Sequence, residues 1–97
     1  MPAREPLSDD AIATALSGLS GWRHESDALV RELDFGDFRE AFAFLTRVAF
    51  EAEALDHHPE IRNVYNTVRL AVTTHDAGNR VTETDLAFAR RVHALQR

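Results

Sequence analysis

The stretch that decides the fold is residues 37–59, which read DFREAFAFLTRVAFEAEALDHHP. Asp37 and Glu40 have the spacing of a capping box, in which each side chain accepts a backbone N–H at a helix start. Apolar residues then recur every three or four positions, which predicts one buried stripe on a long helix. The residues of that stripe are Phe38, Ala41, Phe42, Leu45, Val48, Ala49 and Ala52. Pro59 pushes the preceding residue toward extended geometry, so the helix is expected to end near Asp56.

The residues before this helix predict a shorter helix followed by a β-hairpin. Ser8 is suited to cap a helix, because its hydroxyl can accept a free backbone N–H, and apolar residues follow it at helical spacing. From Trp22 to Phe35, apolar and polar residues alternate with the period of a strand. The polar pair Ser26–Asp27 interrupts that run and predicts the turn of the hairpin.

The residues after the long helix predict more strand and a last helix. Val64 to His75 is rich in β-formers, with an irregularity expected at Asn66 and with His75 at a strand end. Gly78–Asn79 predicts a turn, and Thr82 with Asp85 predicts the capping box of a final helix. The order α-β-β-α-β-β-α predicts an α+β fold, a four-stranded antiparallel sheet with three helices on one face. Residues 1–97 are expected to form a single domain, with 1–6 a loose tail.

Composition narrows the classes of chemistry. The chain of 97 residues has no cysteine and no lysine, which excludes disulfides, thiol nucleophiles and lysine Schiff bases. A net charge of −5 argues against nucleic-acid binding, since such proteins usually carry a basic surplus. No apolar run reaches the length of a membrane span, and the first residues lack the apolar core of a secretory leader. We therefore expect a cytoplasmic protein.

Three of the five histidines, together with nearby carboxylates, are the strongest candidates for chemistry. Histidine gives and takes protons near neutral pH, so this cluster favours acid–base catalysis. Glu53 and His57 are four residues apart on one helix flank, where their side chains are expected to meet. His58 follows directly, and His75 lies on a separate element. A metal site built from these four residues is a weaker alternative, because adjacent histidines at a helix end converge poorly on one ion.

A wider pattern surrounds these residues. Glu53, His57, His58 and Pro59 are followed at defined spacing by Tyr65, His75 and Asp85, and this set resembles the signature of the pterin-4a-carbinolamine dehydratase family. Neighbouring segments share the resemblance, which extends over residues 7–95. Those segments are Gly21-Trp22, Asp37-Phe38, Phe44-x-Thr46-Arg47-Val48, Asn63-Val64-Tyr65-Asn66 and Thr74-His75.

The resemblance implies a hydro-lyase that removes water from 4a-hydroxytetrahydrobiopterin to give quinonoid dihydrobiopterin. This reaction recycles the cofactor of aromatic amino-acid hydroxylases, which makes such a hydroxylase a possible pathway partner. No cofactor and no metal are needed, because the elimination is not a redox reaction and requires only an acid for the departing hydroxyl and a base for the proton on N5. The implied catalytic residues are His57, His58 and His75, with Glu53 orienting His57 and Asp85 supporting His75 or its loop. The implied pterin-binding residues are Asp56, His57, His58, Thr73, Thr74, His75 and Asp76.

Other interpretations remain open. Mammalian relatives also serve as dimerisation partners of a homeodomain transcription factor, so the chain is alternatively a non-catalytic interaction module. A further alternative keeps the chemistry but acts on another pterin, such as a molybdopterin-related compound. The family commonly forms dimers or tetramers. The long helix agrees with this, because Phe44 and Phe50 lie off its stripe and are predicted to be exposed at a subunit contact.

Overall fold

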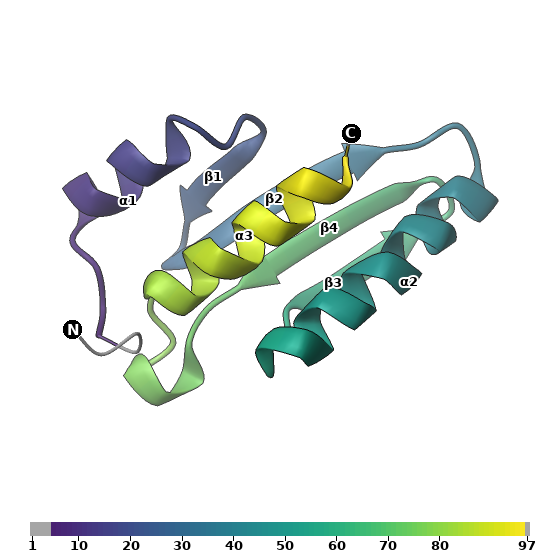
Figure 1. Ribbon diagram of the computed structural model, residues 1–97. Helices are drawn as coiled ribbons and strands as arrows, with labels where there is room; N and C mark the ends of the chain where they lie inside the picture. The colour runs from purple at the N-terminus through teal and green to yellow at the C-terminus, as the bar shows by residue number, and fades with distance from the viewer. Residues whose placement is uncertain (1–4, 97) are drawn as a thin grey trace.

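The computed structural model describes residues 5–96 and has the predicted element order. Its elements are α1 (Asp9–Leu16), β1 (Trp22–Glu25), β2 (Ala28–Asp34), α2 (Phe38–Leu55), β3 (Glu60–Val64), β4 (Thr67–Val72), the 3₁₀ turn η1 (His75–Ala77) and α3 (Glu83–Leu95). The strands form one antiparallel sheet in the order β1-β2-β4-β3. The three helices cover one face of this sheet (Figure 1), which confirms the predicted fold class.

The long helix begins and ends where the sequence predicts. Asp37 caps α2 by accepting the backbone N–H of Glu40 at 2.9 Å. The Glu40 carboxylate accepts the N–H of Gly36 at 2.6 Å, so the reciprocal bond lies one residue earlier than in a standard capping box. The helix ends at Leu55, and Asp56 follows in the left-handed conformation with φ 50°.

The turns between strands explain where the strands end. Ser26 and Asp27 both have positive φ, as the predicted two-residue hairpin turn requires. The run predicted to be strand from Val64 to His75 is interrupted at Tyr65, where φ is 51°, so that Val64 ends β3 and β4 begins at Thr67. β4 ends at Val72, so the prediction that His75 ends a strand is wrong. The chain turns after Thr74 because the backbone N–H groups of Ala77 and Asn79 both bond to the Thr74 carbonyl at 3.1 Å.

The buried stripe of α2 is rotated relative to the prediction. Its buried members are Ala41, Phe44, Leu45, Val48 and Ala52. Phe44 is only 5% exposed, with its ring centroid 5.2 Å from that of Phe35, so the prediction of an exposed Phe44 is wrong. Phe38 and Phe42, predicted to be buried, are 46% and 53% exposed. Phe35 directly follows β2, is partly buried against the core and contacts Phe44, so the Phe44 flank of α2 is the one that faces the core.

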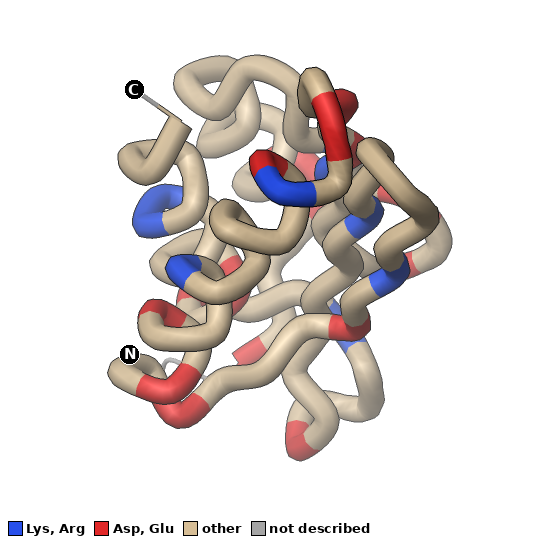
Figure 2. The backbone as a smooth tube through the Cα atoms, turned by 90° about the vertical axis from the view of Figure 1, so that its right-hand side faces the viewer, with Lys and Arg blue, Asp and Glu red and all other residues tan. Residues whose placement is uncertain are grey.

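Charged residues of both signs are distributed along the chain. Basic and acidic positions are interspersed along the backbone in the view of Figure 2. None of the helices within residues 5–96 has the length and apolar character required to cross a bilayer.

The Leu7 N–H bonds to the carbonyl of Val81 at 2.9 Å and fixes the chain just after the predicted tail. Residues 1–4 of that tail lie outside the described residues.

Candidate active site

His57 turns into the protein interior at the end of α2. The left-handed Asp56 redirects the chain, and the backbone N–H of His57 bonds back to the Ala52 carbonyl at 3.0 Å. His57 is only 8% exposed as a result. Its Nε2 lies 2.6 Å from Oδ1 of Asp85, the third residue of α3. This contact joins the C-terminal end of α2 to the N-terminal end of α3, which lie at the same end of the molecule as η1 (Figure 1).

Two buried threonines hold the other oxygen of Asp85. Its Oδ2 accepts the backbone N–H of Thr82 and the hydroxyl of Thr74, each at 2.8 Å. The two threonine hydroxyls are 2.7 Å apart, and Oγ1 of Thr82 also accepts the N–H of Thr84 at 3.2 Å. The Thr82 hydroxyl therefore donates to the Thr74 hydroxyl, which in turn donates to the Asp85 carboxylate. All three residues are at most 1% exposed.

This network assigns the proton on His57. A carboxylate oxygen accepts hydrogen bonds, so the ring nitrogen facing Asp85, Nε2, carries the hydrogen. The other ring nitrogen, Nδ1, has no hydrogen-bond partner among the described residues. A buried carboxylate that fixes the tautomer and orientation of a histidine is a recurring arrangement in acid–base catalysis.

His58 has the opposite environment. Its Nε2 lies 2.8 Å from Oε1 of Glu53, and the two side chains are 59% and 79% exposed. Glu53 was expected to orient His57, but it contacts His58 instead. The reason is that the helix stops before His57, so the four-residue spacing from Glu53 no longer places the two side chains on one helical flank.

His75 is exposed on the loop between β4 and α3. It is the first residue of η1, and its Nδ1 lies 3.3 Å from Oδ1 of Asn79. Asp85 was expected to support His75 or its loop, and its described contact is with the loop, through Thr74. The hydroxyl of Thr74 is therefore committed to Asp85. Of the other residues expected to line the pterin site, Asp56 and Asp76 are exposed and Thr73 is half-buried.

The residue that sequence reasoning missed is Thr82. The capping-box pattern identified it only as the start of α3, and that role is confirmed. Nothing in the local sequence shows that its hydroxyl meets Thr74 across the η1 loop. The metal alternative also depends on tertiary contacts, and within residues 5–96 no group of three or more histidine or acidic side chains is arranged to hold a metal ion.

Comparison with known proteins gives one consistent result. Residues 5–95 match the family model described as pterin 4 alpha carbinolamine dehydratase. A relative from Opitutus terrae is 52% identical over 92% of each chain, and one from Nitrobacter hamburgensis is 50% identical over 96% of this chain and 93% of its own. Both relatives carry a provisional name as pterin-4-alpha-carbinolamine dehydratases.

Two solved structures share the fold. A protein from Brucella melitensis, described as a transcriptional coactivator/pterin dehydratase, is 40% identical with a TM-score of 0.88 and covers 94% of this chain and 98% of its own. A pterin dehydratase-like protein identified as a RuBisCO assembly factor of the alpha-carboxysome is 29% identical, with a TM-score of 0.65. It covers 77% of this chain and 88% of its own.

Proposed function

This chain belongs to the pterin-4a-carbinolamine dehydratase family, and from that premise we propose that it dehydrates 4a-hydroxytetrahydrobiopterin to quinonoid dihydrobiopterin. In this elimination the bond between C4a and the hydroxyl oxygen breaks. The departing hydroxyl takes a proton and leaves as water, N5 loses its proton to a base, and a C4a–N5 double bond forms. The step involves no oxidation or reduction and needs only an acid for the departing hydroxyl and a base for the N5 proton, so positioned histidines are sufficient to catalyse it.

The observation that carries this proposal is the buried pair of His57 and Asp85. An ordinary surface histidine needs no fully buried carboxylate behind it, and here Asp85 is itself held by two threonines. We propose that His57 exchanges its proton with the substrate at Nδ1, while Asp85 remains a carboxylate and keeps the ring in place. Asp85, Thr74 and Thr82 are then positioning residues.

We assign the complementary proton transfers to His58 and His75. Both are exposed, and each has one hydrogen-bonding partner that limits the rotation of its ring, Glu53 for His58 and Asn79 for His75. Asp56, Thr73 and Asp76 are proposed to contact the pterin ring, with Thr74 contributing only backbone groups.

The test is direct assay of 4a-carbinolamine dehydration with the purified protein. We expect catalysis that survives exhaustive dialysis against a chelator. The double variant His57→Ala/His58→Ala is expected to lose about 10²–10⁴-fold in rate, the usual effect of removing acid–base groups. Full activity of that variant would show that the histidine assignment is wrong. Activity restored by zinc after dialysis would favour a metal site.

A non-catalytic role is the second candidate, and one structural neighbour favours it. The neighbour identified as a RuBisCO assembly factor shares the fold at 29% identity, so the same fold is compatible with a role in assembling other proteins. The same assay discriminates between the two roles. A folded wild-type protein with no dehydratase activity on any 4a-hydroxypterin would favour the interaction module, whereas activity confined to a different pterin would revise only the substrate.

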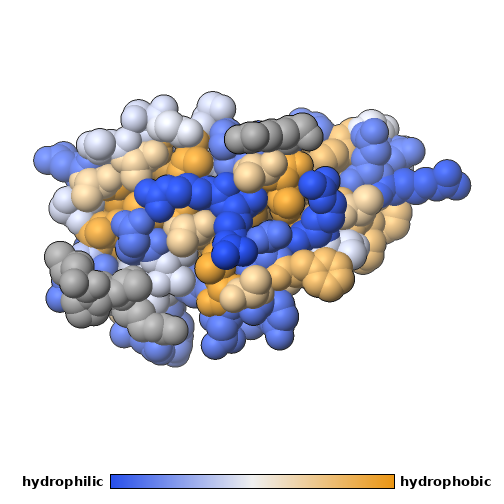
Figure 3. Space-filling view, in the orientation of Figure 1, coloured by the Kyte–Doolittle hydropathy of each residue, from blue (hydrophilic) through white to orange (hydrophobic). Residues whose placement is uncertain are grey.

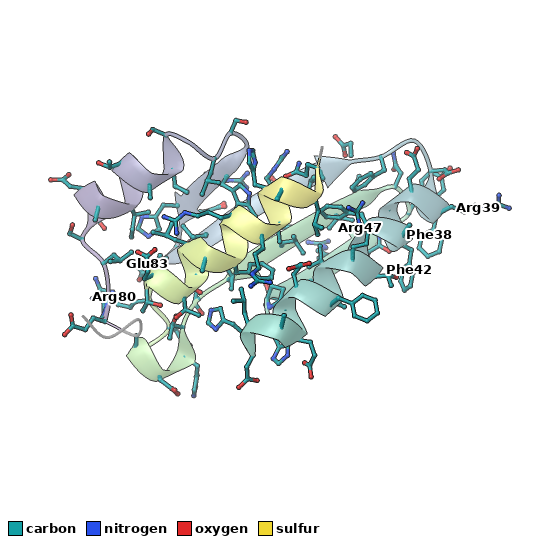
Figure 4. The ribbon with its side chains drawn as sticks, viewed as in Figure 1. Phe38, Arg39, Phe42, Arg47, Arg80 and Glu83 are labelled. Atoms are coloured by element: carbon teal, nitrogen blue, oxygen red, sulfur yellow. The ribbon has the colours of Figure 1, made fainter. Side chains whose placement is uncertain are left out.

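We also propose that the protein is a homodimer or homotetramer with α2 at the subunit contact. Three phenylalanines of α2 are exposed: Phe38 at 46%, Phe42 at 53% and Phe50 at 71%. Phe38 and Phe42 stack with ring centroids 5.5 Å apart and project away from α3 (Figure 4). Figure 3 shows apolar surface along this edge of the molecule. Soluble monomers seldom expose such a cluster.

Light scattering at micromolar concentration tests the assembly. We expect a dimeric or tetrameric mass for the wild type and a smaller mass for Phe42→Glu. Ala13→Glu, at an exposed position on α1, adds the same single negative charge away from α2 and is the matched control. A monomeric wild type, or Phe42→Glu with unchanged mass, would contradict an interface on α2.

A further inference from the structure

A cavity lies at the opposite end of α2 from the histidines. It encloses about 710 Å³ between the end of β2, the first half of α2 and the C-terminal end of α3. Its apolar lining includes Leu33, Phe35, Phe44 and Leu95, and its basic lining is Arg31 and Arg47. None of the proposed catalytic residues lines this cavity. Its volume is in the range of small-molecule sites, which commonly combine apolar walls with a few charged groups.

Arg31 is the unusual feature of this cavity. It lies on the helix-covered face of β2 between the buried Leu29 and Leu33, where an apolar residue is expected. Its Nη1 donates to the Glu32 carbonyl at 2.6 Å, but its Nε is buried with no hydrogen-bond partner. Burial lowers the pKa of Arg31. The described residues offer its guanidinium no carboxylate.

Two other arginines of the sheet, Arg23 and Arg69, have carboxylate partners, and Arg62 of β3 has none among the described residues but is exposed to solvent. Arg23, on the open face, contacts Glu32 at 2.8 Å and Glu25 at 3.2 Å. Arg69 lies 3.7 Å from Glu25. Of these four arginines, Arg31 alone lies half-buried on the helix-covered face without a counter-charge among the described residues.

The backbone makes room for the Arg31 head group. Gly21 lies beside Trp22, the cross-strand neighbour of Arg31, and a Cβ at Gly21 would overlap the guanidinium carbon. Gly21 also has φ +89°, which other residues adopt poorly. Glycine at this position therefore keeps the guanidinium in its half-buried place.

A second cation and an aromatic wall complete the cavity. Arg47 lies on the side of α2 that faces α3, in contrast to Arg39, Phe38 and Phe42 (Figure 4), and it has no ion pair among the described residues. The adjacent Phe35 and Phe44 rings form the apolar wall. Two of the acidic residues at the rim are already occupied, since Glu32 binds Arg23 and Glu40 binds the N–H of Gly36.

We propose that this cavity binds a small aromatic monocarboxylate, with its carboxylate at Arg31 and Arg47 and its ring against Phe35, Phe44 and Leu95. Guanidinium groups bind carboxylates through paired hydrogen bonds, and such a ligand supplies the missing counter-charge. The acidic rim of Glu32, Asp34 and Glu40 disfavours a dianion such as a phosphate monoester. The site is independent of the dehydratase activity proposed above.

Nuclear magnetic resonance titration tests this site without an activity assay. Benzoate is expected to bind with a Kd on the order of 1 mM and to shift the backbone signals of Phe35, Phe44 and Leu95. Benzamide, which has the same shape without the charge, and phenyl phosphate, which carries a second charge, are expected to bind at least about tenfold more weakly. Equal binding of benzamide would contradict a charge-based site, and tighter binding of phenyl phosphate would contradict the carboxylate assignment.

Variants locate the binding. Arg31→Gln and Arg47→Gln are each expected to weaken benzoate binding about tenfold or more. Arg39→Gln, an exposed arginine on the outer side of α2, is the matched control and is expected to bind as the wild type does. Thermal melts establish that each variant is folded. If Arg31→Gln does not fold, the binding measured with Arg47→Gln is the decisive test. Saturable binding unaffected by the decisive variant, or no saturable shift in the wild type, would overturn the proposal.

Discussion

His57 and His58 are neighbours in sequence but lie in opposite environments. His57 is 8% exposed and contacts a carboxylate that is 0% exposed and held by two threonines. The His58 side chain is 59% exposed and contacts a carboxylate side chain that is 79% exposed. Both histidines follow the left-handed residue Asp56, beyond the end of α2, and the first side chain lies inside the protein while the second lies in solvent.

The difference predicts that the two histidines contribute in different ways. A hydrogen bond to a buried charged group is worth about 1.5–3 kcal/mol, and its loss leaves the partner unsatisfied. An exposed ion pair contributes about 0–1 kcal/mol. Substitutions on the His57 side should therefore affect folding and catalysis together, and those on the His58 side should affect catalysis alone.

The largest effect is expected for Asp85→Ala. This change removes the buried partner of His57, the acceptor for Thr74 and half of the α3 capping box. We expect the free energy of unfolding to fall by about 3–5 kcal/mol, as for a broken buried pair. Urea denaturation gives the value, and Glu83→Ala, an exposed acid of the same helical turn, is the control. A loss of stability no larger than that of Glu83→Ala would show that the buried contact between His57 and Asp85 does not stabilise the protein.

The two histidines are compared directly by His57→Ala and His58→Ala. We expect His57→Ala to lower kcat/KM by about 10²–10⁴-fold and stability by about 1–3 kcal/mol. His58→Ala should lower activity less and change stability by less than about 0.5 kcal/mol. Parallel assays and urea midpoints measure both. Equal losses of stability would show that burial does not distinguish the two residues.

Thr82 tests whether the hydroxyl chain supports His57. Thr82→Val keeps the shape but removes the hydroxyl, and we expect a loss of about 1–2 kcal/mol in stability. Thr82→Ser should restore both stability and activity. The ¹⁵N signals of His57 report on its tautomer, and a shift in Thr82→Val that is absent in Thr82→Ser would show positioning. Unchanged signals in both variants would limit Thr82 to capping α3.

The smallest effect is expected for Glu53→Gln. Among residues 5–96, its carboxylate has one partner, the exposed His58 side chain, so stability should change by less than about 0.5 kcal/mol. Any fall in kcat/KM should be modest and should vanish in the His58→Ala background. A fall that persists there would place Glu53 in contact with the substrate itself.

The sequence predicted the helix limits and turns well because those depend on local chemistry. Asp37, Ser26–Asp27 and the Thr82 capping box act through their own backbone or a partner three residues away. It failed for the α2 stripe because many residues of that helix are apolar. Periodicity alone cannot rank Phe38, Phe42 and Phe44 when the deciding neighbour is Phe35.

The sequence predicted which residues form the histidine site, but not which carboxylate contacts which histidine. The sequence places Glu53 and His57 at helical spacing, and the pairing depends on whether the helix continues to His57. It stops two residues short, with Asp56 in a conformation that non-glycine residues seldom adopt. The partner of His57 then comes from a part of the chain that no local pattern relates to it.

The contact between His57 and Asp85 spans 28 residues of sequence. The β3–β4 hairpin and the η1 loop lie between the two residues, so the contact exists only while α3 is docked beside the end of α2. Any opening that releases the first turn of α3 separates the pair, even while the rest of the sheet stays intact. Activity is then a sensitive reporter of local opening, and inactivation by heat should precede the loss of β-sheet signal in the same sample.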